Sequence, residues 1–155
     1  MKTKTKHFGE VDLDESKILT FESGIIGFQE FTRWTIMYDI EKKDKNPVSW
    51  LQSLDEPLLA IPMLNPFTVI DEYNPLINDD YLVDLGEFKE ENLIVLVSMT
   101  VPRDVKKATV NLRAPFIINT DNNKGVQVIV EDEKFPIKYD IYEAVQKMKK
   151  EKGED

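Results

Sequence analysis

Two glycines, Gly24 and Gly27, stand three residues apart in the stretch GIIGFQEF, a spacing that a phosphate-binding loop could use. Such a loop needs a strand, a glycine-rich turn and a helix whose free amide groups point at the anion, usually with a lysine and a hydroxyl beside it. The residues that follow, FQEFTRW, supply neither the lysine and serine nor an amphipathic helix. We therefore interpret the glycines as a bend between two strands that turns Ile25, Ile26 and Phe28 into the core.

Histidine and cysteine chemistry is almost excluded, because His7 is the single histidine and cysteine is absent. A serine triad would have to take its base from the N-terminal region, which we expect to be unstructured, and the chain has no Gly-x-Ser-x-Gly elbow. Zinc would depend on carboxylates and that one histidine, a rare ligand set. We expect neither a metal nor a cofactor. A glycosidase-like pair of carboxylates stays open, because the chain has 29 acidic residues and their separation in space is not visible.

Residues 121–132, DNNKGVQVIVED, have acids or amides at the first, third and twelfth positions of a calcium loop. The sixth position is Val126, where the sharp turn of such a loop needs glycine. Asparagine, aspartate and glycine between two apolar runs are also turn residues. We therefore predict a β-hairpin here and no calcium site.

Composition places the chain among acidic globular proteins. Its 155 residues carry a net charge of −9 with a pI near 4.7, so the average surface repels nucleic acid and anionic lipid, and an electrostatically steered partner should be basic. The absence of cysteine fits a reducing compartment, and the longest apolar run, residues 93–97, is far below the ~20 residues of a membrane span. We expect a cytoplasmic protein with neither a secretion signal nor a membrane anchor.

The densest acidic stretch is residues 71–91, with eight carboxylates and one lysine, and aromatic side chains lie among them. A solvated face is the ordinary explanation of such a stretch. The alternative is a recognition surface in which aromatic side chains anchor a basic protein and the carboxylates steer it. The candidate partner-binding residues are Asp71, Glu72, Tyr73, Asp79, Asp80 and Asp84.

Short apolar or alternating runs separated by turn residues predict an all-β fold. The expected strands are residues 16–21, 34–40, 48–54, 58–64, 67–70, 81–85, 93–100, 106–112, 116–119 and 126–131. Strands at this density favour a small antiparallel β-barrel or sandwich in one domain, residues 1–155. Trp34 and Trp50 each fall on a period-two face and are expected in the core.

Helix is expected in two places. Residues 87–91 are expected to form a short turn, and residues 139–150 to form a short C-terminal helix that places Ile141, Val145 and Met148 on one stripe. The charged tail, about residues 147–155, is expected to be frayed because it has little apolar surface to bury.

A resemblance to a known family becomes visible from several short motifs taken in order. GIIGF at residues 24–28, WLQSL at 50–54, NPF at 65–67 and NLRAPFIIN at 111–119 have the order and spacing of the flagellar assembly factor FliW family. The family-motif residues are Gly24, Gly27, Phe28, Gln52, Pro66, Phe67, Asn111, Arg113, Pro115, Asn119 and Gln127. The chain departs from the pattern at Gln29 and Asn65, where the family often has acids.

The resemblance implies a small cytoplasmic β-barrel-like protein with no catalytic activity and two protein partners. One partner is flagellin before its export. The other is the carbon storage regulator CsrA, an RNA-binding protein that represses flagellin translation and that the family antagonises. The residues alone also allow an open barrel that binds an oligosaccharide, or a small hydrolase with a carboxylate pair.

The NLRAPF motif has structural roles available as well. Asn111 and Arg113 can satisfy backbone carbonyls or pair with an acid at a strand end, and Pro115 interrupts a strand ladder because it has no N–H to donate.

Overall fold

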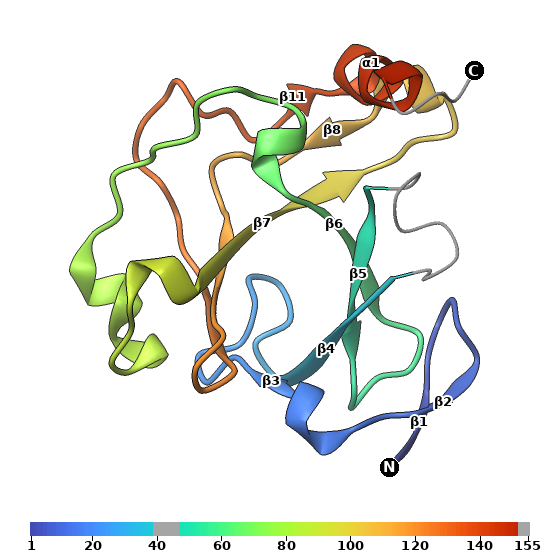
Figure 1. The fold of residues 1–155 in the computed structure, drawn as a ribbon, viewed down its shortest axis with the longest axis vertical. Helices are drawn as coiled ribbons and strands as arrows, with labels where there is room; N and C mark the ends of the chain where they lie inside the picture. Colours follow the sequence, from blue (N-terminus) through green and yellow to red (C-terminus); the bar gives the residue numbers. More distant parts are fainter. Residues whose placement is uncertain (39–46, 152–155) are drawn as a thin grey trace.

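The computed structural model describes residues 1–38 and 47–151 (Figure 1). The strands are β1 (Lys2–Lys4), β2 (Glu10–Asp12), β3 (Leu19–Thr20), β4 (Arg33–Met37), β5 (Ser49–Ser53), β6 (Ala60–Leu64), β7 (Leu93–Thr100), β8 (Thr109–Val110), β9 (Phe116–Asn119), β10 (Lys124–Gln127) and β11 (Tyr139–Asp140). One α-helix, α1 (Tyr142–Glu151), follows β11. Short 3-10 helices occur at Glu15–Lys17, Pro66–Thr68, Asp79–Leu85, Glu90–Asn92 and Val105–Lys107.

Seven strands close a barrel in the order β7, β6, β5, β4, β3, β10 and β9, and β9 returns to β7. Every neighbouring pair in this ring is antiparallel except β3 and β10, which are parallel. β8 and β11 extend the sheet outward from the far end of β7, beside α1 (Figure 1). The expected β-barrel fold is therefore confirmed, with one parallel pair.

Alternate side chains of the strands point inward and fill the barrel interior. Phe116 and Ile118 of β9 point inward and join Phe21 and Trp34, while Ile117 between them points outward. Gly125 of β10 is paired with Ile118 and faces the same interior, where a Cβ atom would lie 2.5 Å from the ring of Phe21. A side chain at this position would therefore compete with Phe21 for the same space.

A second core lies outside the barrel, under α1. Ile141 is buried there, and Val145, one helical turn later, packs against the same cluster. The Tyr73 ring packs edge-on against Phe135 with ring centroids 4.9 Å apart, and its hydroxyl donates to the Leu112 carbonyl oxygen at 2.5 Å. The predicted apolar stripe is thus confirmed at Ile141, which directly precedes α1, and at Val145.

Two predicted strands are wrong: residues 67–68 and 81–85 lie in 3-10 helices, and residues 69–70 belong to no strand. In both cases an asparagine caps the turn. Asn65 accepts from the Phe67 amide at 3.0 Å with Pro66 at the first helical position, and Asn78 accepts from the Asp80 amide at 2.9 Å. An N-cap asparagine followed by proline or acids starts a helical turn, and this local signal outweighed the apolar residues.

The N-terminal region, expected to be unstructured, forms a β-hairpin of β1 and β2. The hairpin is attached to the barrel at two places. The Lys6 amide donates to Gln52 Oε1 at 3.0 Å, and the His7 ring stacks on Trp50 with centroids 3.9 Å apart. Trp34 is fully buried as expected, whereas Trp50 is only partly buried and forms the platform for His7.

The predicted strands 16–21 and 106–112 shorten to β3 and β8, because a 3-10 helix precedes each of them at 15–17 and 105–107. Other boundaries differ by a few residues. β9 and β10 form the predicted hairpin, whose turn residue Asn123 has φ of 57°, but the regular strand ends at Gln127. Residues 139–140 belong to β11, and α1 continues to Glu151, into the segment expected to be frayed. Residues 39–40, at the end of one predicted strand, and 152–155 lie outside the described residues. No helix among residues 1–38 and 47–151 has the length and apolar character needed to cross a membrane.

Candidate functional site

The GIIGF bend leads from β3 to β4 and closes one end of the barrel. Gly24 and Gly27 have φ of 73° and 88°, in the left-handed region that glycine adopts without strain. At Gly24 a Cβ atom would also lie 2.5 Å from the Gln29 Cα. The bend predicted from the two glycines is therefore confirmed.

The side chains of the bend divide between the core and the surface. Ile25 is buried in the barrel interior and Phe28 packs against the same cluster. Ile26, expected in the core, is 48% exposed instead. Residues 25 and 28 form an isolated antiparallel bridge, and this tight turn points the intervening Ile26 away from the barrel.

Gln127 connects the bend to the rest of the site. It is in register with Phe116 and so faces the barrel interior at this end. Its Oε1 accepts from the Ile26 amide at 2.9 Å, and its Nε2 donates to the Ala114 carbonyl at 3.2 Å. One side-chain amide therefore joins two motifs that are about 90 residues apart in the chain.

The NLRAPF segment crosses from β8 to β9 beside the bend. Asn111 Oδ1 accepts from the Arg113 amide at 3.0 Å, and the Arg113 Nε donates to the Phe135 carbonyl at 3.1 Å. The Pro115 carbonyl accepts from the Val128 amide at 3.1 Å. The prediction that Arg113 satisfies backbone carbonyls is confirmed, whereas Asn111 accepts from an amide instead.

These motifs surround a hollow of about 430 Å³ at the end of the barrel. We call it the motif groove, and its defining residues are Ile26, Asn111, Arg113, Gln127, Ile129 and Ile137. Three isoleucines on it are about half exposed, Ile26 at 48%, Ile129 at 52% and Ile137 at 55%. Exposed apolar side chains that gather around a hollow are typical of a protein-docking site.

Sequence reasoning did not identify Ile129 and Ile137. A signal existed for the first: Val126, Val128 and Val130 alternate and are all buried, so Ile129 must lie on the opposite face. Nothing comparable marks Ile137, which follows a proline in an irregular segment.

The remaining motif residues lie away from the motif groove, and all but Phe67 are buried in the fold. Gln52 is buried, and its Nε2 donates to the carbonyls of Ser53, Pro57 and Leu59. Asn119 is buried, and its Nδ2 donates to the carbonyls of Leu85 and Glu87 at 2.9 and 3.0 Å. Pro66 is buried, whereas Phe67 is 60% exposed.

The acidic candidate residues do not form one compact cluster. Asp71 lies near α1, whereas Asp79, Asp80 and Asp84 belong to the 3-10 helix at the other end of the same connection, on the left of Figure 1. Asp84 accepts a hydrogen bond from the Ser23 hydroxyl. Tyr73 is buried and bonded to Leu112, so its side chain is part of the core and is unavailable as an exposed anchor.

A larger hollow, about 880 Å³, lies at the opposite end of the barrel, and two carboxylates line it. Both already have partners: Asp12 pairs with the amino group of Met1 at 3.0 Å, and Asp121 accepts from the Asn92 side chain at 3.1 Å. Within residues 1–38 and 47–151, no group of three or more histidines, aspartates or glutamates is arranged to hold a metal ion.

Comparison with known proteins agrees with the motifs. The chain matches the FliW protein family over residues 2–141. It is 57% identical over 151 residues to the flagellar assembly factor FliW of Lachnoclostridium phytofermentans, covering 97% of each chain, and 42% identical over 148 residues to that of Lachnospira eligens, covering 95% of this chain and 98% of the relative. A crystal structure of the flagellar assembly factor FliW superposes with a TM-score of 0.83 at 30% identity, over 92% of this chain and 97% of that one. This chain therefore belongs to the FliW family of flagellar assembly factors.

Proposed function

We propose that this protein binds flagellin in the cytoplasm before export and, when flagellin is scarce, binds and antagonises the translational regulator CsrA. Membership of the FliW family is the observation that carries this proposal, because its relatives are named flagellar assembly factors. The protein acts by binding alone: it holds one partner or the other, and neither is changed chemically.

The acidic surface is assigned to CsrA. An RNA-binding regulator displays basic surface to its RNA, and a protein with a net charge of −9 is complementary to it. The exposed acids Asp71, Glu72, Asp79 and Asp80, with the half-buried Asp84, provide this complementarity from two ends of one connection. Attraction between exposed charges falls with salt, so CsrA binding should weaken as ionic strength rises.

Flagellin requires a different surface. The terminal segments of unassembled flagellin are expected to be amphipathic helices, whose apolar faces need cover before export. The half-exposed isoleucines around the motif groove offer apolar surface for that purpose.

The experiment is a calorimetric titration of the protein with CsrA from the same organism, repeated with monomeric flagellin present and at raised salt. Saturable binding that weakens with salt and is displaced by flagellin supports the proposal. Absence of CsrA binding to the folded protein contradicts the CsrA half of it. Salt-independent binding would contradict the assignment of the acidic surface.

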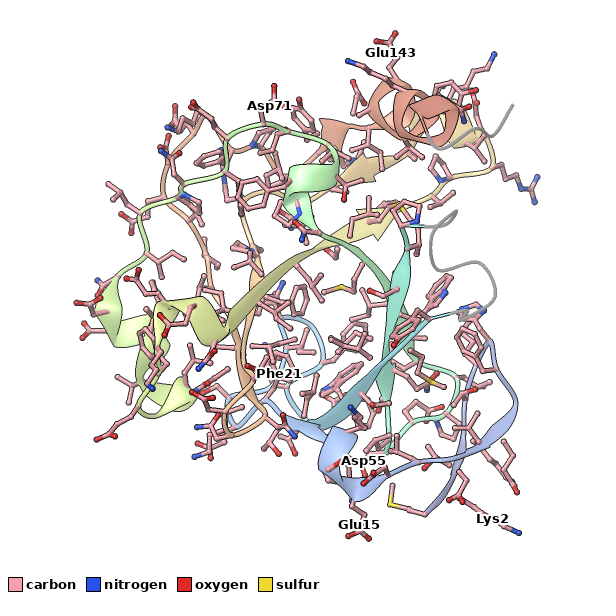
Figure 2. All side chains as sticks on the ribbon, in the orientation of Figure 1. Lys2, Glu15, Phe21, Asp55, Asp71 and Glu143 are labelled. Carbon is pink, nitrogen blue, oxygen red and sulfur yellow. The ribbon has the colours of Figure 1, made fainter. Side chains whose placement is uncertain are left out.

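Charge reversal locates the interface. Asp79→Lys with Asp80→Lys tests one end of the connection, and Asp71→Lys with Glu72→Lys tests the other. The control is Glu10→Lys with Glu15→Lys, which makes the same change in net charge on exposed residues of another region; in Figure 2, Glu15 lies at the opposite end of the molecule from Asp71. We expect at least one acidic pair to weaken CsrA binding at least fivefold more than the control does.

A further inference from the structure

Arg113 is unusual among the three arginines of this chain. Arg33 pairs with Asp55 at 2.5 Å, and Arg103 is exposed on a loop. Arg113 is partly buried and is the single charged residue on the lining of the motif groove. Among the described residues no carboxylate pairs with it, although the protein has more acids than bases.

The guanidinium is nevertheless held in place. Its Nε donates to the Phe135 carbonyl at 3.1 Å, and Nη2 makes a long contact of 3.5 Å with the Glu133 carbonyl. These contacts use one edge of a planar group that has five N–H donors, and Nη1 donates to no group among the described residues. A guanidinium fixed by neutral carbonyls keeps its full charge and is preorganised for a carboxylate.

Further donors lie beside it. Asn111 turns its Oδ1 to the Arg113 amide, and its Nδ2 donates to no group in the described residues. Ser98 and Thr100, whose hydroxyls are potential donors, are lining residues of the same groove. This set of groups combines a cation with neutral donors and contains no acidic side chain. It therefore favours binding of a negatively charged acceptor, which in a protein partner is a carboxylate.

The surroundings of Arg113 are apolar on more than one side. The Arg113 carbonyl accepts from the Val130 amide at 2.7 Å, and the Leu112 amide donates to the Pro136 carbonyl at 3.0 Å. These bonds bring Ile129 and Ile137 next to Arg113 from two different segments. A carboxylate bound here would therefore have apolar neighbours, as an acid on the apolar face of an amphipathic helix does.

We propose that the motif groove binds an amphipathic helix of flagellin, and that Arg113 forms an ion pair with an aspartate or glutamate on the apolar face of that helix. The identity of the partner rests on the proposed function, whereas the chemistry that is recognised comes from the groove. The isoleucines cover the apolar residues of the helix. Arg113 fixes the position of the helix along the groove, because an apolar groove with one cation can pair with an acid of the helix at one place only.

The proposed binding modes of the two partners differ in their electrostatics. CsrA is recognised by exposed carboxylates and long-range attraction, whereas the helix carries negative charge toward an acidic protein and is held by short-range contacts. Flagellin binding should therefore depend less on salt than CsrA binding does.

The test is calorimetry with monomeric flagellin and three kinds of variant. Arg113→Glu should weaken flagellin binding at least tenfold, and Ile129→Asp and Ile137→Asp at least fivefold each. Arg103→Glu is the matched control, with the same change of charge on an exposed arginine outside the groove, and should stay within twofold of the wild type. Because Arg113 also holds two carbonyls, each variant is checked by thermal unfolding, and the two exposed isoleucines test the groove with little effect on the fold.

A charge exchange identifies the acid. Acidic residues on the helical termini of flagellin are changed to lysine one at a time, and one such change should weaken binding to the wild type and restore binding to Arg113→Glu. Wild-type and Arg113→Glu proteins that bind flagellin equally would overturn this inference and leave the proposed function standing. Wild-type protein that binds no flagellin would overturn both, and a panel without any exchange partner would overturn the ion pair.

Discussion

The Gln127 side chain offers the sharpest test of how the site is built. Its two hydrogen bonds, 2.9 Å from the Ile26 amide and 3.2 Å to the Ala114 carbonyl, join the GIIGF bend to the NLRAPF segment. Gln127→Leu removes both bonds and keeps a side chain of similar size. We expect the bend to detach from β10 while the barrel stays folded.

The magnitude follows from where the two bonds lie. The Ile26 amide is at the surface and can bond to water, so its loss costs about 0.5 kcal/mol, whereas the Ala114 carbonyl belongs to a buried residue and its loss costs about 1–1.5 kcal/mol. A total of about 1.5–2 kcal/mol lowers the melting temperature of a domain of this size by about 3–8 °C. Hydrogen exchange at residues 24–28 should accelerate more than at the interior strands.

Gln29→Leu is the matched control, since Gln29 is exposed and its side chain makes no hydrogen bond among the described residues. The assay is thermal unfolding with hydrogen exchange read by mass spectrometry. Equal melting temperatures and equal exchange at residues 24–28 in the two variants would refute the role given to Gln127. Gln127→Glu refines the test: an ionised carboxyl keeps an acceptor for Ile26 but loses the donor to Ala114, so its stability relative to the wild type should rise as the carboxyl is protonated at low pH.

Three further predictions concern the fold. Gly125→Ala should destabilise the protein by about 1–3 kcal/mol in urea unfolding, because the new methyl group enters the space of the Phe21 ring. In the double variant with Phe21→Leu, the two destabilisations should be clearly non-additive. Additive destabilisations would contradict a clash between the two side chains. Burial raises the pKa of the Tyr73 phenol above its ordinary 10.0, so the unfolded state loses its proton first and stability should fall as pH rises beyond about 10; Tyr73→Phe, less stable at neutral pH, should lose this alkaline sensitivity. Desolvation and then the charge of a neighbouring lysine lower the pKa of His7 below 6.5, so the unfolded state takes up the proton first and stability should fall as pH drops through 6.5. Because the His7 ring lies against Trp50, the fluorescence emission of Trp50 should change with a midpoint below pH 6.5. His7→Gln should abolish that change.

Much of the fold could be predicted from the sequence because barrel strands leave a local signature. The runs that became β4 to β7 and β9 alternate or are continuously apolar, and their boundaries are close to the predicted ones. The two wrongly predicted strands are those in which a local cap competes with an apolar run. Asn65 with Pro66, and Asn78 before two aspartates, each start a 3-10 helix where β-pattern reasoning predicted a strand.

The candidate site was predictable only in part. The two glycines identified the bend, since their positive φ is a local requirement. The meeting of the bend with Arg113 and Ile137 depends on how the barrel closes, which no local pattern contains. The acidic stretch was visible as composition, but the burial of Tyr73 was not, because a tyrosine among acids looks the same in sequence whether its ring packs outward or against Phe135.

The way the barrel closes explains why a groove exists at this end. β7 pairs with β9 through residues 93–96 and with β8 through residues 99–100, so its neighbour changes along its length. The connection between those two neighbours, residues 111–115, makes no ladder pairs of its own and includes Pro115, which has no N–H to contribute. Its side chains and carbonyls are therefore available for Gln127, for the adjoining segments and for a partner.

The same groups of the NLRAPF segment support the barrel end and line the groove, so mutations in the motif affect both. Substitutions at Asn111, Pro115 or Gln127 will change the stability of the barrel end and the shape of the groove together, so a loss of binding there cannot be assigned to a lost contact. Ile129 and Ile137 are different, because about half of each side chain faces solvent and neither belongs to a core cluster. If both isoleucines can be made polar without loss of flagellin binding while the Gln127 variants lose it, the motif supports the fold and the binding surface lies elsewhere. If the isoleucine variants lose binding at an unchanged melting temperature, the groove itself is the interface.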